Sequence, residues 1–107
     1  HGGGSLAMLL PRLRHAWGKV PPVREALADD PLQQARQLYV DDLVYDVATL
    51  RRLIEVFGGE RVMAGTDYPF VIMDDDPAGS IDAVATDRAR RQALRAGNAR
   101  RWLGENP

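Results

Sequence analysis

A strand–helix–strand succession between residues 38 and 64 constrains the fold of this chain more than any other feature. Leu38–Tyr45 is rich in Tyr, Val and Leu, which is typical of a strand. Val47–Phe57 carries apolar residues at helical spacing, and Arg61–Ala64 is a second, short apolar run. A helix that joins two strands is the signature of a parallel sheet, so the sequence predicts an α/β fold.

Local signals mark the ends of the central helix and the two faces of the first strand. Asp46 is placed to cap the helix, and Gly58-Gly59 is placed to end it. The two aspartates within the strand need partners or water if they are buried. Alternation puts Tyr39, Asp41, Leu43 and Tyr45 on one side, and Val40, Asp42 and Val44 on the other.

Asp67 follows the second strand directly. The strand runs into Gly65-Thr66-Asp67, and Pro69 cannot continue a ladder of backbone hydrogen bonds. Asp67 is therefore expected at the carboxyl end of a strand, where ligands and catalytic groups gather in α/β sheets and barrels. The alternative interpretation is that Asp67 only caps the turn that follows it.

Helices are also predicted on both sides of this unit. Ser5 is a candidate cap for the first of them. Pro11 conflicts with an unbroken helix, so we expect either a kink there or a helix that begins near Pro11. The acidic run Asp74–Asp76 is interpreted as a solvated loop, with a second cation site as the alternative. The expected helices are Ser5–Trp17, Val23–Ala28, Pro31–Gln37, Ser80–Ala85 and Asp87–Ala96, with Gly97-Asn98 as a stop that doubles as a cap for Ala99–Leu103.

The composition argues against polyanionic and membrane partners. The net charge is −1, which gives no general attraction to nucleic acid or to an anionic membrane. No apolar run approaches the ~20 residues of a membrane span, and the absence of cysteine gives no sign of an oxidising compartment. We therefore expect a cytoplasmic protein without nucleic-acid or membrane partners.

Four stretches of the chain, taken in order, resemble the amidohydrolase-related (amidohydrolase 2) family of the aminocarboxymuconate-semialdehyde decarboxylase type. The sequence GTDYPF at residues 65–70 resembles the metal-binding Asp motif of that family. The likeness covers nearly the whole chain and is weakest across Lys19–Gln37 and Val71–Thr86. The other three stretches are His1–Gly4, which resembles a metal-binding His with its Gly-rich continuation, Tyr39–Asp46, and Ala93–Ala99 with Leu103-Gly104.

This resemblance implies that residues 1–107 form the C-terminal portion of a single (β/α)8 TIM-barrel domain of the metal-dependent hydrolase type. Such a barrel needs ~250 residues. The chain has 107 residues and begins at His1, on a Gly-rich turn with no element before it. We therefore expect the N-terminal strands of the barrel to be missing from this sequence.

The resemblance also implies a site for a divalent metal ion, with Zn²⁺ as the expected ion. His1 and Asp67 are the implied ligands, and Asp67 is also an expected catalytic residue. A neutral imidazole and a carboxylate are ordinary zinc ligands. The family has two more His ligands in an HxH motif, which has no match here, because the only other histidine is His15, within a helical pattern. The expected site is therefore incomplete.

Tyr45 is the second expected catalytic residue. It stands where the decarboxylases of the family have a His that acts as an acid or base. The pKa of a tyrosine is ordinarily ~10, which suits proton transfer at neutral pH poorly. Tyr45 is instead able to donate a hydrogen bond to a substrate carboxylate. The alternative is a packing residue whose hydroxyl binds to the backbone.

The implied activity is that of a metal-dependent hydrolase or decarboxylase acting on a small carboxylate, a lactone or an aromatic acid. It belongs to a longer protein, for which a homodimer is the expected assembly, and the chain alone is expected to be inactive. The alternative is a non-catalytic fragment or protein-interaction module that binds a partner through exposed apolar surface. An HxH-bearing segment upstream in the source gene would favour the enzyme.

Overall fold

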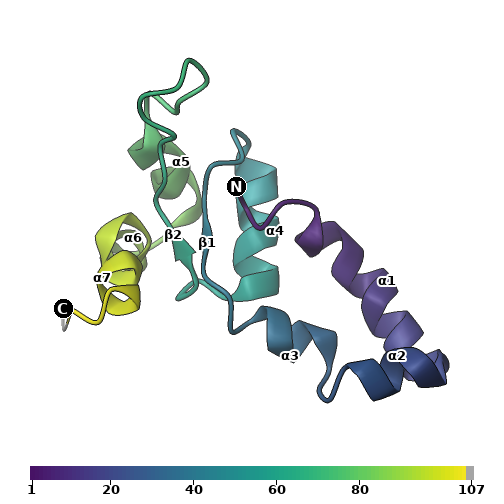
Figure 1. The fold of residues 1–107 in the computed structure, drawn as a ribbon. Coiled ribbons are helices and arrows are strands. Elements are labelled where there is room, and N and C mark those ends of the chain that lie inside the picture. The colour runs from purple at the N-terminus through teal and green to yellow at the C-terminus, as the bar shows by residue number, and fades with distance from the viewer. Residues whose placement is uncertain (106–107) are drawn as a thin grey trace.

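A parallel strand pair lies at the centre of the computed structural model, which describes residues 1–105 (Figure 1). Helices α1 to α3 extend to one side of the pair, and α5 to α7 lie on the other. The elements are α1 Leu6–Lys19, α2 Pro21–Ala26, α3 Pro31–Ala35, β1 Val40–Asp41, α4 Val47–Phe57, β2 Val62–Met63, α5 Pro77–Val84, α6 Arg88–Gln92, the π-helical η1 Ala93–Gly97 and α7 Asn98–Trp102.

The two strands pair in parallel, as predicted, with Val40 opposite Val62 and Asp41 opposite Met63. Both are shorter than the sequence predicted. The ladder ends where Asp42 N donates to Met63 O (2.9 Å). Val44 N then donates to Asp42 O (2.8 Å), which forms a tight turn, so the backbone is no longer extended when it reaches Tyr45. The predicted strand Leu38–Tyr45 was therefore too long at its carboxyl end.

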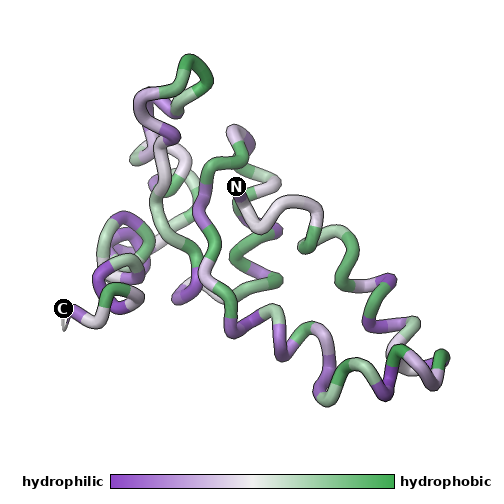
Figure 2. Tube along the Cα trace, in the orientation of Figure 1, coloured by the Kyte–Doolittle hydropathy of each residue, from purple (hydrophilic) through white to green (hydrophobic). Residues whose placement is uncertain are grey.

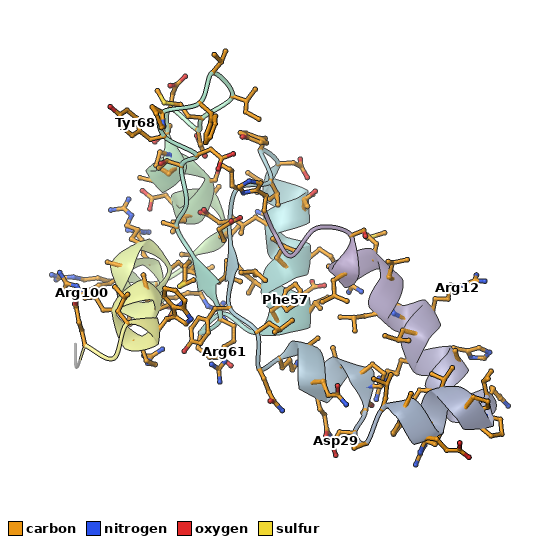
Figure 3. The ribbon with its side chains drawn as sticks, in the orientation of Figure 1. Arg12, Asp29, Phe57, Arg61, Tyr68 and Arg100 are labelled. Atoms are coloured by element: carbon orange, nitrogen blue, oxygen red, sulfur yellow. The ribbon has the colours of Figure 1, made fainter. Side chains whose placement is uncertain are left out.

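Helix α4 links the two strands and has the predicted bounds. Asp46 caps it, because its Oδ2 accepts hydrogen bonds from Thr49 N and Thr49 Oγ1, both at 2.7 Å. Gly58, at φ 94°, ends it. The inner face of the helix is buried, with Phe57 at the centre of the molecule (Figure 3). Together with Leu50, Val62, Ile81 and Leu94, this residue forms the fully buried part of the core.

The helix does not end at Gly97-Asn98, contrary to the sequence prediction of a stop and a new cap at these residues. Both residues have helical backbone angles, and η1 continues directly into α7. The side chain of Asn98 is fully buried. Its amide donates to Gly59 O (2.8 Å) and to Val62 O (2.7 Å). Asn98 therefore joins the C-terminal helices to β2, a role that its local sequence does not reveal.

Helix α1 runs through Pro11, so the expectation of a helix beginning near that residue was wrong. Ala7 and Leu10 are buried in the core, and this packing holds the turn before the proline in place despite the cost of an interior proline. Ser5 precedes the helix without a capping hydrogen bond from its side chain. Helix α5 begins at Pro77, earlier than predicted, because Asp76 Oδ1 accepts from Gly79 N (3.0 Å).

Candidate metal centre

His1 and Asp67 converge beyond the carboxyl ends of β1 and β2. His1 Nε2 lies 3.4 Å from Asp67 Oδ2. The structure thus brings together the two side chains that the sequence analysis assigned to a metal ion. Asp67 is mostly enclosed, with 18% of its side chain exposed, whereas the His1 ring is 60% exposed. The imidazole is therefore open to a ligand from the solvent side.

A left-handed turn positions His1. The glycines at positions 2 to 4 all have positive φ, and Gly4 N donates to His1 O (2.8 Å). The conformation of Gly2 excludes other residues, because a Cβ there would lie 2.5 Å from Val44 Cγ1. The Gly-rich turn therefore packs directly on the segment that follows β1 and brings His1 to the end of that strand.

Asp67 also has a left-handed backbone, with φ 58°. Aspartate tolerates this conformation better than most residues. Its carbonyl oxygen accepts from Phe70 N (2.8 Å), and Asp74 N donates to Thr66 O (2.9 Å). Asp67 is therefore the first residue of a closed loop, and its carboxylate is directed back toward His1. The prediction that it follows a strand end is confirmed.

Asp41 is a site residue that the sequence analysis did not single out. Its Oδ2 lies 3.2 Å from His1 Nδ1, while Oδ1 accepts from Gly2 N (2.8 Å) and from Leu43 N (3.2 Å). A metal-binding His ordinarily donates its second ring N–H to a carboxylate or carbonyl. With that proton on Nδ1, the lone pair of Nε2 faces Asp67. The sequence signal that could have identified Asp41 was its predicted position on the same strand face as Tyr45.

The separation of the two donors fits one metal ion. With bonds of ~2.0–2.2 Å, two ligands of a tetrahedral zinc lie about 3.4 Å apart, which is the distance between His1 Nε2 and Asp67 Oδ2. Within residues 1–105, however, no three His, Cys, Asp or Glu side chains are grouped so that they could hold a metal ion. The chain therefore offers two donors of a set that needs at least three protein ligands for a catalytic zinc.

Tyr45 lies at the same end of the strands but is directed to a different partner. It has a left-handed backbone, with φ 55°. Its hydroxyl donates to Ile72 O (2.5 Å). Partial desolvation raises the pKa of Tyr45, and the carboxylates of Asp67, Asp74 and Asp41 raise it further, so the phenol stays protonated at neutral pH. The catalytic role assigned from the sequence remains a prediction.

Comparison with known proteins shows the family of this chain. The model of the amidohydrolase family matches residues 1–105. The chain belongs to the amidohydrolase family. It is 30% identical over 109 residues to 2-amino-3-carboxymuconate-6-semialdehyde decarboxylase of Dictyostelium discoideum, covering 100% of this chain and 30% of the relative. The enzyme of the same name from Caenorhabditis elegans is 35% identical over 71 residues, which are 65% of this chain and 18% of the relative.

Solved structures give the same result for the fold. The crystal structure of 5-carboxyvanillate decarboxylase from Sphingomonas paucimobilis matches with a TM-score of 0.80 and 27% identity, over 99% of this chain and 32% of that one. The crystal structure of IDCase from Metarhizium anisopliae in its apo form matches with a TM-score of 0.79 and 25% identity, over 97% of this chain and 32% of that one. The chain thus spans about a third of the length of these proteins. The predicted portion of an amidohydrolase-type barrel is confirmed.

Asp42 is a buried acid of this family member, with only 5% of its surface exposed. Its Oδ1 accepts from Gly65 N (2.8 Å), and its Oδ2 has no partner among the residues that the structure describes. Burial raises the pKa of Asp42, the nearby carboxylates of Asp41 and Asp74 add to this, and the Gly65 N–H opposes it. Asp42, one of the two aspartates of the predicted strand, is therefore buried with only one of its two carboxylate oxygens hydrogen-bonded.

Several other polar groups have local partners. Asp74 Oδ1 accepts from Asp76 N (2.8 Å), and Asp76 in turn caps α5, so these carboxylates serve a turn and a helix end. His15 is exposed on α1. Asp82 pairs with two C-terminal arginines, Arg91 at 3.2 Å and Arg95 at 2.6 Å.

Of the helices in residues 1–105, none has the length and apolarity that a membrane crossing requires.

Proposed function

We propose that this chain supplies two ligands of a divalent metal site in an enzyme that removes CO2 from a small carboxylic acid. The observation that carries the proposal is the approach of His1 Nε2 to Asp67 Oδ2, 3.4 Å apart at the carboxyl ends of parallel strands. Decarboxylation is favoured over hydrolysis because three of the compared proteins are named decarboxylases. Hydrolysis of a lactone or related carboxylate is the second reaction to test.

The donor set supports zinc as the ion. His1 would supply an imidazole nitrogen and Asp67 a carboxylate oxygen, and the remaining ligands would have to come from elsewhere in the full-length protein, because residues 1–105 hold no group of three such donors. A bound divalent ion would supply a Lewis acid that neutralises the negative charge of the substrate's carboxylate. Asp41 holds the His1 ring through Nδ1, which fixes the direction of Nε2. The catalytic role predicted for Tyr45 is not part of this proposal, because its hydroxyl donates its hydrogen bond to Ile72 O.

The geometry also supports a second role for His1. Both of its ring nitrogens face carboxylates, Asp41 at 3.2 Å and Asp67 at 3.4 Å. If both nitrogens carry protons, His1 is a proton donor beside the metal ligand Asp67 and is not itself a ligand. Decarboxylation requires such a donor, because the carbon that loses CO2 must gain a proton. The metal content of a His1 variant separates the two roles.

The test uses the full-length gene product and a panel of aromatic and aliphatic carboxylic acids, with CO2 release as the readout. We expect activity in the metal-loaded protein, loss of activity after chelation, and recovery on adding Zn²⁺. His1→Gln should abolish turnover, whereas His15→Gln, which changes an exposed histidine of α1, should not. Lower metal content in His1→Gln identifies a ligand, and unchanged metal content identifies a proton donor. Full activity of His1→Gln would refute the proposal.

A further inference from the structure

Residues 68–73 form a loop whose apolar side chains have no place in the core. Figure 1 shows the loop beyond the carboxyl ends of β1 and β2, and Figure 2 shows that its tip is apolar. Val71 is fully exposed, and Tyr68, which projects from the loop in Figure 3, is 77% exposed. Phe70 and Ile72 are each about two-thirds exposed. Packing against the core therefore does not determine the position of this loop.

Hydrogen bonds within the loop close it but do not fix its direction. Phe70 N donates to Asp67 O (2.8 Å), Met73 N to Phe70 O (3.0 Å), and Asp74 N to Thr66 O (2.9 Å). All of these bonds join residues between 66 and 74. A segment with few packed contacts and exposed backbone bonds opens easily.

Among residues 1–105, one side chain from another part of the fold forms a hydrogen bond to this loop. The hydroxyl of Tyr45 donates to Ile72 O at 2.5 Å, across 27 positions of the sequence. Tyr45 is itself well placed, because Asp46, its neighbour, is bound into the cap of α4. The bond therefore links the end of β1 to the loop that follows β2.

The backbone of Tyr45 is consistent with a specific requirement at this position. Its φ of 55° lies in the left-handed region, which is uncommon for a bulky aromatic residue. That conformation departs from the alternation of the strand and brings the ring out toward the loop, where 58% of the residue is exposed. An uncommon backbone conformation beside a candidate site, here at the carboxyl ends of the strands, points to function.

We propose that Tyr45 is a positioning residue, whose hydroxyl holds the loop 68–73 beside Asp67 so that the apolar side chains of the loop form one wall of the substrate site. The inference rests on the proposed function, because the loop directly follows Asp67, the proposed metal ligand. The substrate class that fits it is an acid with an apolar or aromatic body. The hydroxyl donates to Ile72 O and not to Asp67, so its removal should leave metal binding unchanged.

The test is Tyr45→Phe in the full-length gene product, which keeps the ring and removes the hydroxyl. We expect amide hydrogen exchange at Met73 and Asp74 to become faster, by roughly two- to tenfold, the range of one hydrogen bond. The KM for an aromatic acid should rise by a similar factor, with a smaller change in kcat and with unchanged metal content. Tyr39→Phe, which removes a hydroxyl from the other end of β1, is the matched control and should change neither quantity.

Two results would overturn the inference. Unchanged exchange in residues 70–74 of Tyr45→Phe would show that the hydroxyl does not hold the loop. A fall in kcat with unchanged KM would place Tyr45 in the chemical step instead of the wall. Failure of the proposed function is distinguishable from both, because a protein with no turnover on any acid still reports loop opening through hydrogen exchange.

Discussion

Asp42 shows how a single buried carboxyl couples stability to pH. Its pKa in the folded state is raised, first by burial and then by the charges of Asp41 and Asp74. In the unfolded chain the value returns to about 3.9. Between these two values the folded state binds more protons than the unfolded state, so the free energy of unfolding falls as the pH rises. The stabilising contribution is complete below about pH 3.9 and is lost as the pH passes the folded value.

Asp42→Asn should therefore make the protein more stable at neutral pH. The amide keeps an oxygen for Gly65 N but has no charge to desolvate. We expect the free energy of unfolding to decline less steeply with rising pH above about pH 4 than in the wild type. Urea unfolding at several pH values measures this, with Asp75→Asn, an exposed acid, as the control. Parallel curves for Asp42→Asn and wild type would contradict the electrostatic account.

At the scale of elements, the central unit was predictable, whereas the continuity of the C-terminal helices through Gly97-Asn98 was not. The bounds of α4 follow from Asp46 and Gly58, because capping residues act on their own neighbours. Gly97-Asn98 carries the same kind of local signal, yet the helix continues because the Asn98 side chain binds backbone carbonyls of distant residues. Tertiary contacts of this kind override local propensity, and no pattern within residues 93–102 records them.

Asn98→Ala tests the importance of this junction. The change leaves Gly59 O and Val62 O without their buried donor and removes a fully buried side chain. Each unsatisfied buried group costs ~1–3 kcal/mol, so we expect a loss of about 2–4 kcal/mol in the free energy of unfolding. Chemical denaturation measures it, and Gln92→Ala, an exposed amide on the same helical segment, should change stability little. Equal stability of the two variants would show that the junction contributes nothing.

At the scale of the whole molecule, the site was predictable in part. Sequence motifs predicted His1 and Asp67 as metal ligands, which stays a prediction, and the parallel strands bring His1 Nε2 within 3.4 Å of Asp67 Oδ2. Asp41 was missed because its role depends on the turn at Gly2, which brings His1 back to β1. A hydrogen bond from the Tyr45 hydroxyl to the backbone was predicted as the alternative for this residue, but its partner, Ile72 O, could not be predicted, because loop contacts across 27 positions follow from no periodic pattern. The homodimer and the cytoplasmic location stay predictions.

The most direct test of the shared metal site is a metal-binding titration of the full-length gene product, compared with Asp67→Asn and Asp75→Asn. Asp67 lies 3.4 Å from His1 Nε2, whereas Asp75 is an exposed acid of the loop before α5. We expect wild type and Asp75→Asn to bind one divalent ion with equal affinity, and Asp67→Asn to bind it more than about a hundredfold more weakly, beyond the range of outer-shell changes. Equal affinity of Asp67→Asn and wild type would contradict the account.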